Sequence, residues 1–173
     1  MSPAIIFNVH LVLGYVPWLL ALGTYILPRL KAMGQFEAQR AIATLHSFRF
    51  FGLVFILPGV IGPNLPTAFG NFAAYGDFAT GILAILALLT ARIRLLFWSF
   101  IVAFNAVGAA DILIDYYHGN QVDLPTLSGQ LAATYWIPIL YVPILMITHV
   151  VAFYLLLRRQ PNAAPTLVHK TVA

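Results

Sequence analysis

Five long runs of apolar residues, separated by short polar or charged stretches, make up most of this 173-residue chain. An α-helix needs about 20 apolar residues to cross a lipid bilayer, and the first run has no charged residue before Arg29. We therefore expect an all-α membrane protein that forms a single bundle of five transmembrane helices. The expected spans are approximately residues 5–28, 45–60, 73–91, 95–117 and 131–157.

The connections between these runs also carry predictions. Prolines and glycines interrupt residues 61–72, which we expect to form an apolar loop at the surface or dipping into the membrane. The third span is apolar on all sides below Thr80, so we expect this helix to face lipid at the rim of the bundle. A polar loop is expected at 118–130, and a disordered cytoplasmic tail at 160–173 after a single domain at 1–159.

The composition supports a membrane environment. Hydrophobic residues make up 61% of the chain and charged residues only 8%, whereas about a quarter of the residues of a soluble domain are charged. The absence of cysteine excludes disulfides, iron–sulfur clusters and thiolate metal sites. The nine Lys and Arg residues are scattered and form no basic run, so we expect lipid, and no nucleic acid, as a partner.

The distribution of basic residues predicts the orientation. With five spans, all nine basic residues fall on one side, and Glu37 alone of the five acidic residues joins them. The positive-inside rule places that side in the cytoplasm, with the N-terminus outside, as in a multi-pass protein of a bacterial-type inner (plasma) membrane. An even number of spans would break this partition. The nine residues are Arg29, Lys31, Arg40, Arg49, Arg92, Arg94, Arg158, Arg159 and Lys170.

Ionisable residues in the fourth span provide the candidate site. Asp111 is the deepest of them and is followed by three apolar residues; an ionisable group in such a position is costly and indicates a function. His10 on the first span lies in the same half of the membrane. We expect Asp111 and His10 to be proton-binding partners. The polar cluster that forms their entrance is expected to comprise Asp115, His118, Asn105 and Tyr15.

Each of these residues also has a structural interpretation. Asp115 and His118 lie where a helix reaches the lipid headgroups and charge costs little, and a hydrogen bond from His10 would make Asp111 a packing residue. Arg49, near the cytoplasmic boundary, is expected to extend to lipid phosphate. His149 follows Thr148 and is placed for a hydrogen bond between helices.

Three functions remain open at this stage, and whether the protein is an enzyme is open as well. The first is proton-coupled or small-solute transport or conduction; a chain this small, without an inverted repeat, would work as a homo-oligomer or in a membrane complex. The second is a haem-b-binding cytochrome or oxidoreductase, in which the haem contacts would come from His149, Arg49 and His46. The third is a non-catalytic accessory subunit that binds lipid or quinone.

A divalent metal is a weaker possibility. Asp115, His118 and His10 carry suitable donor atoms, but an Asp-x-x-His spacing on one helix is not specific. We predict no metal site.

Overall fold

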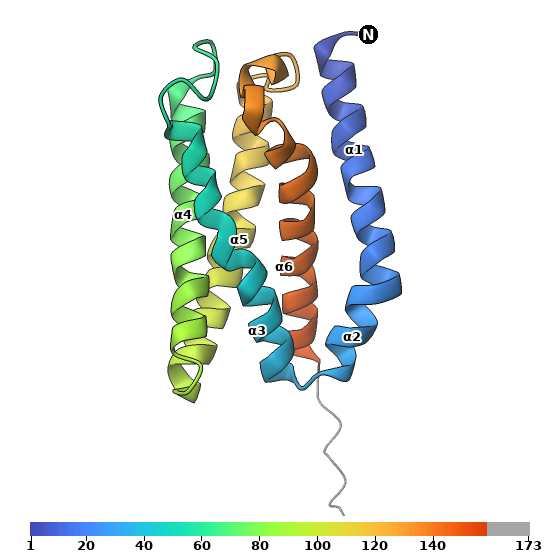
Figure 1. The fold of residues 1–173 in the computed structure, drawn as a ribbon, viewed down its shortest axis with the longest axis vertical. Coiled ribbons are helices and arrows are strands. Elements are labelled where there is room, and N and C mark those ends of the chain that lie inside the picture. Colours follow the sequence, from blue (N-terminus) through green and yellow to red (C-terminus); the bar gives the residue numbers. More distant parts are fainter. Residues whose placement is uncertain (159–173) are drawn as a thin grey trace, which may run out of the picture.

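The computed structural model describes residues 1–158, and the predicted tail at 160–173 lies outside them. The described residues form helices and connecting turns without strands, which confirms the all-α prediction. Figure 1 shows the helices side by side in one upright bundle. Two of the elements are π-helices (η1 and η4) and two are 3₁₀-helices (η2 and η3). In chain order they are α1 (Pro3–Ala21), η1 (Leu22–Ile26), α2 (Leu27–Ala32), α3 (Gln35–His46), η2 (Ser47–Ile56), α4 (Thr67–Leu89), α5 (Arg94–Gln121), η3 (Ser128–Thr134), η4 (Ile137–Tyr141) and α6 (Val142–Leu157).

Four helical segments of the described chain are long and apolar enough to cross a membrane. They correspond to the first, third, fourth and fifth expected spans. The second expected span, 45–60, is not among them, because the chain there forms the end of α3 and the 3₁₀-helix η2, which stops at Ile56. In Figure 1, α3 and η2 together run obliquely from the lower end of the bundle toward its upper end, where η2 packs along α4. The four segments are Pro3–Ala32, Thr67–Leu89, Arg94–Gln121 and Ile137–Leu157.

Several element boundaries differ from those expected. The loop before α4 ends at Pro66, so residues 67–72 of the predicted loop are helical. Helix α5 continues to Gln121, so it includes the first four residues of the predicted polar loop at 118–130. The expected fifth span is not one α-helix: it starts in η3, where Ala132 has a φ of 46°, and passes through η4 before α6 begins.

Helix α4 is not the lipid-facing rim helix predicted for 73–91. It packs against η2 and α5, and most of the residues it buries are small, which allows neighbouring backbones to approach closely. Helix α1 takes the outer position instead, with Phe7 as its buried residue. The residues that α4 buries are Phe69, Gly70, Ala73, Ala74, Asp77, Thr80, Gly81, Ala84 and Ala87.

Prolines shape the contact between α1 and the segment η4–α6. Pro143 has no N–H with which to bond the carbonyl of Ile139, four residues earlier. That oxygen faces Gly14 of α1 at a distance that leaves no room for a Cβ. One turn further along α1, Trp18 Nε1 donates to the carbonyl of Leu140 at 2.9 Å. The irregular backbone of η4 is therefore supported by α1.

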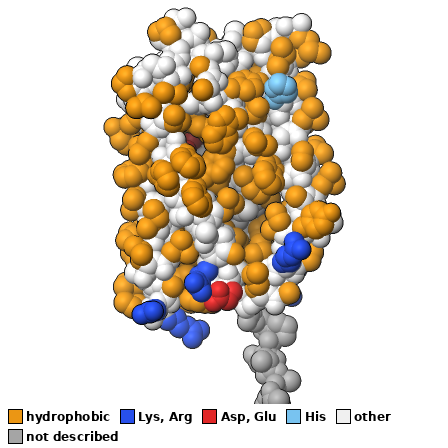
Figure 2. All heavy atoms as spheres, in the orientation of Figure 1, with side chains coloured by type: hydrophobic (Ala, Val, Ile, Leu, Met, Phe, Trp, Pro, Cys, Tyr) orange, Lys and Arg blue, Asp and Glu red, His pale blue; other side chains and the backbone are white. Residues whose placement is uncertain are grey.

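Charged side chains gather at one end of the molecule. Figure 2 shows a face covered largely by hydrophobic side chains, with Lys, Arg and one acidic side chain at the lower end, near α2 and α3. Six basic residues of the described chain are exposed, and Arg49 is the buried exception. The exposed residues are Arg29, Lys31, Arg40, Arg92, Arg94 and Arg158.

Candidate functional site

Arg49 is buried in the bundle and bonded to two carboxylates. It lies on η2 with 1% of its surface exposed. Its Nε donates to Asp77 Oδ1 on α4 at 2.6 Å, and its Nη2 donates to Asp111 Oδ2 on α5 at 2.6 Å. A buried guanidinium requires such partners. The expectation that Arg49 extends to lipid phosphate is therefore wrong.

The third nitrogen of the guanidinium reaches α6. Arg49 Nη1 donates to the carbonyl of Gly108 at 3.2 Å and lies 3.3 Å from His149 Nε2. Arginine is a donor only, so His149 Nε2 must accept and the ring proton must sit on Nδ1. This Nδ1 lies 3.0 Å from Asn105 Oδ1, and Asn105 Nδ2 donates to the carbonyl of Ile101 at 2.9 Å. The contacts together assign a neutral His149 in one tautomer.

His46 stacks beside His149. The two ring centroids are 4.0 Å apart, and His46 Nε2 lies 3.0 Å from Thr148 Oγ1. The Thr148 hydroxyl donates to the carbonyl of Ile144 at 2.7 Å. Because a hydroxyl has a single proton, His46 Nε2 is the donor to Thr148. His46 Nδ1 is then an acceptor, and it is buried without a partner.

Three glycines make room for the charged groups. A Cβ on Gly52 would collide with the carboxylate of Asp77, and a Cβ on Gly76 with that of Asp111. A Cβ on Gly108 would lie 2.6 Å from His149 Nε2 and 2.7 Å from Arg49 Nη1. The close packing of η2, α4 and α5 around Arg49 therefore depends on these missing side chains.

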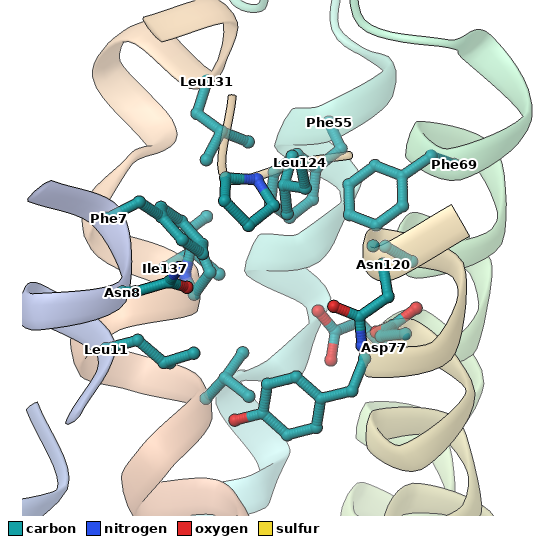
Figure 3. A pocket seen from close by; sticks show the side chains of 17 residues that line it. Phe7, Asn8, Leu11, Phe55, Phe69, Asp77, Asn120, Leu124, Leu131 and Ile137 are labelled. Atoms are coloured by element: carbon teal, nitrogen blue, oxygen red, sulfur yellow. The ribbon is translucent and has the colours of Figure 1, made fainter. Parts of the chain in front are cut away.

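A cavity of about 100 Å³ adjoins the carboxylates. Asp77 lines it from α4 and Asp115 from α5, one turn beyond Asp111. One oxygen of Asp111 and one of Asp115 are buried without a hydrogen-bond partner. The rest of the lining is mostly apolar and includes Phe7, Leu11, Phe55, Phe69, Leu131 and Ile137 (Figure 3).

The structure corrects the predicted pairing of His10 with Asp111. His10 is exposed on α1, and its Nδ1 lies 3.0 Å from the hydroxyl of Tyr135. Asp111 faces η2 and α4 instead, where it meets Arg49. The sequence indicates a similar depth for the two residues, but α1 packs on η4 and α6 and not on the Asp111 face of α5.

The predicted entrance residues are only partly brought together. His118 packs its ring edge-on against Phe72, with the ring centroids 4.7 Å apart, and does not join the charged groups. The Tyr15 hydroxyl lies 2.6 Å from that of Tyr116, which lines the cavity. Asn105 belongs to the His149 side of the site. Asp115 is the one entrance residue that lies at both the cavity and the carboxylates.

The sequence reasoning does not identify Asp77, and it considers Arg49 only as a haem contact or as a residue that extends to lipid phosphate. The expected spans put Asp77 at the head of the third helix and Arg49 at the edge of the second. No charged residue lies between Arg49 and Asp77 in the sequence, so these two residues mark the ends of a long uncharged stretch. This isolation from other charged residues is the sequence signal that could have indicated a buried ion pair between Arg49 and Asp77.

The histidines do not fit the haem that the sequence leaves open as an alternative. Both nitrogens of His149 are occupied by Arg49 and Asn105, and the ring of His46 lies against that of His149. Cofactor pockets typically enclose about 300–1,000 Å³, far more than the cavity beside Asp77. We therefore assign no haem to these residues. Within residues 1–158, no group of three or more His, Cys, Asp or Glu is placed to hold a metal ion.

Comparison with known proteins identifies a family without assigning an activity. No curated protein matches the sequence significantly. No solved structure matches it significantly either. One family model, described as "Domain of unknown function (DUF8737)", matches residues 6–157, which include every residue of the site described above. The chain therefore belongs to the DUF8737 family of domains of unknown function.

Proposed function

We propose that this protein carries protons across a membrane, in conduction or in exchange for a small solute, through the buried groups around Arg49. The observation that carries the proposal is the surplus of acid: Asp77 and Asp111 bond a single guanidinium, and Asp115 lines the same cavity as Asp77. One positive charge balances one carboxylate, and an apolar interior does not tolerate the remaining charge. Protons taken up by the carboxylates restore the balance, which makes the site able to bind and release them.

A file of polar groups supports a path away from the carboxylates. His149 and His46 follow Arg49 along the bundle, and the buried Gln39 lies two turns before His46 on α3. Gln39 Nε2 donates to the carbonyl of Ala152 at 2.9 Å, which leaves its Oε1 buried without a partner. Two turns of helix span about 10 Å, so water would complete this inner part of the path.

The proposal includes five membrane crossings. Helix α3 has 12 residues and η2 has 10, which gives ~38 Å at about 1.5 and 2.0 Å per residue. That length is sufficient for the ~30 Å hydrocarbon core, so we count α3–η2 as the second crossing. Five crossings place the chain ends on opposite sides, and the exposed basic residues favour a cytoplasmic C-terminal end in a plasma membrane.

The test is proton flux into vesicles that contain the purified protein. A potassium gradient with valinomycin would drive protons inward, and a pH-sensitive dye trapped inside would report them. Wild-type vesicles should acidify faster than protein-free vesicles, and Asp111→Asn should slow this flux by at least about tenfold. Asn at this position keeps the shape of the side chain, and Asp77 still balances the charge of Arg49, so we expect the variant to fold.

The matched control is Glu37→Gln. Glu37 is an exposed acid whose ion pair is with Arg40, one turn along α3. This variant should carry protons like the wild type. If wild-type vesicles acidify no faster than empty ones, the charged cluster is structural. The apolar cavity would then favour the alternative of an accessory subunit that binds lipid or quinone.

A further inference from the structure

The cavity beside Asp77 has the chemistry of a cation site. Among the described residues, its lining contains the two carboxylates of Asp77 and Asp115 and no Lys, Arg or His. Arg49, the nearest compensating charge, lies behind Asp77 and is not part of the lining. An occupant therefore meets negative charge that no cation in the wall balances. This arrangement disfavours anions and favours a positively charged ligand.

Both carboxylates in this wall have an oxygen without a hydrogen-bond partner among the described residues. Asp77 is 5% exposed, and its Oδ1 accepts from Arg49 Nε, while its Oδ2 makes no hydrogen bond within the described residues. Asp115 Oδ1 is buried without a partner as well. Figure 3 shows Asp77 across the open space from Phe7 and Leu11 of α1. Buried polar atoms are normally hydrogen-bonded, so Asp115 Oδ1 indicates a missing donor.

The remaining walls match the other end of such a ligand. Phe7, Phe55, Phe69 and Tyr116 bring aromatic rings to the cavity, and such apolar surfaces suit the hydrocarbon part of a ligand. The amides of Asn8 and Asn120 are the only other polar side chains of the lining besides Tyr116 and the carboxylates. A cavity of about 150 Å³ holds benzene, so about 100 Å³ suits a slimmer body such as a short alkyl chain.

We infer that this cavity binds a small organic ammonium ion, with its charged nitrogen at Asp77 and Asp115 and its apolar part against α1 and η4. The inference rests on the proposed function, because it gives the proton-binding carboxylates a substrate that competes with the proton. When the ammonium ion enters, a proton leaves one carboxylate, so the charge of the site does not change. The O–H bond of that carboxyl group is the one covalent bond that breaks, and its proton passes to water. A protein that exchanges such an ammonium ion for a proton is a proton–amine exchanger.

The test uses n-butylammonium, with n-butanol as its neutral counterpart of similar shape. Isothermal titration of the purified full-length protein in lipid nanodiscs should show saturable binding of butylammonium and none of butanol. Lowering the pH should weaken the binding by up to about tenfold per pH unit, as expected when one proton competes with one ligand. Asp115→Asn should weaken it at least tenfold, whereas Asp123→Asn, an exposed loop acid, should leave it unchanged.

A steric pair of variants tests the cavity without altering charge. Leu11→Trp fills the space from α1 and should abolish binding, whereas Leu13→Trp, on the exposed side of the same helix, should not. Equal binding of butanol, or full binding by Asp115→Asn, overturns the inference. Butylammonium binding without any proton flux supports the ligand site and overturns the proposed function. Proton flux without butylammonium binding supports the proposed function and overturns the ligand site.

Discussion

Gly108→Ala tests the packing around Arg49 with a single methyl group. In an ordinary helix this change stabilises a protein by about 0.5–1 kcal/mol. Here the new Cβ would lie 2.6 Å from both His149 Nε2 and Thr80 Cγ2, and 2.7 Å from Arg49 Nη1. Such distances are far below van der Waals contact, so the methyl group must push the guanidinium and the imidazole away from α5.

The expected magnitude follows from the contacts that would be disturbed. Overpacking a close-packed interior costs about 1–3 kcal/mol, and loss of a hydrogen bond to a charged group costs about 1.5–3 kcal/mol. The bond at risk is that from Arg49 Nη1 to the Gly108 carbonyl. After the gain in helix propensity, we expect a net loss of about 2–5 kcal/mol in the free energy of unfolding. For a chain of this size, that corresponds to a fall in Tm of roughly 5–20 °C.

The assay is thermal unfolding of the detergent-solubilised protein, followed by far-UV circular dichroism. Gly23→Ala is the matched control, because Gly23 is helical and exposed, and a methyl group added there would meet no atom within 4 Å. It should unfold at the wild-type temperature or slightly above. If Gly108→Ala is as stable as Gly23→Ala, Arg49 and His149 do not pack as closely against Gly108 as the distances indicate.

Three further predictions follow from the same contacts. Arg49→Met leaves two buried carboxylates without their cation and should destabilise the protein by about 3–5 kcal/mol in the same thermal assay; an unchanged Tm would refute the ion pairs. His10→Ala should change neither Tm nor proton flux, since His10 is exposed and contacts a tyrosine; a loss of flux would show that His10 takes part in proton transfer. Because the chain has no cysteine, single cysteines report topology: an impermeant maleimide should label Ser2→Cys and Gly129→Cys from outside intact cells, and Gly34→Cys only after lysis. Labelling of all three from one side would exclude five crossings.

Helix content and the burial of Asp111 can be predicted from the sequence, but the partner of Asp111 cannot. An ionisable residue among apolar ones stands out in any membrane-like stretch, and its helical face follows from its spacing. Which neighbouring helix meets that face depends on how the bundle is assembled. His10 and Asp111 lie at similar depth, yet α1 packs against η4 and α6. Depth alone therefore selects the wrong partner for Asp111, which bonds Arg49 and no histidine within the described residues.

The depth of Arg49 and Asp77 is misjudged from the sequence because the expected helices begin too late in the chain. The expected second span begins at residue 45, whereas the helical segment that carries Arg49 begins at Gln35, 14 residues before it. The expected third span begins at residue 73, whereas α4 begins at Thr67, ten residues before Asp77. Polar residues in the first turns of α3 keep them out of the expected span, and loop-like Gly and Pro before α4 conceal its start. Each shift moves a charge from the edge of an expected span into the interior of a helical segment.

The composition of the cluster argues that it is more than a structural ion pair. A buried ion pair stabilises a protein weakly, and well-packed hydrophobic residues often replace it without loss. A structural role for Arg49 would need one carboxylate for charge balance, yet Asp77 and Asp111 both bond it. Asp115 adds a third carboxylate at the cavity, and His46 retains an unpartnered nitrogen on the far side. Each of these extra groups lowers stability unless something binds to it. A proton at the carboxylates, and an ammonium ion in the cavity beside them, are the occupants that we propose for this surplus of acceptors.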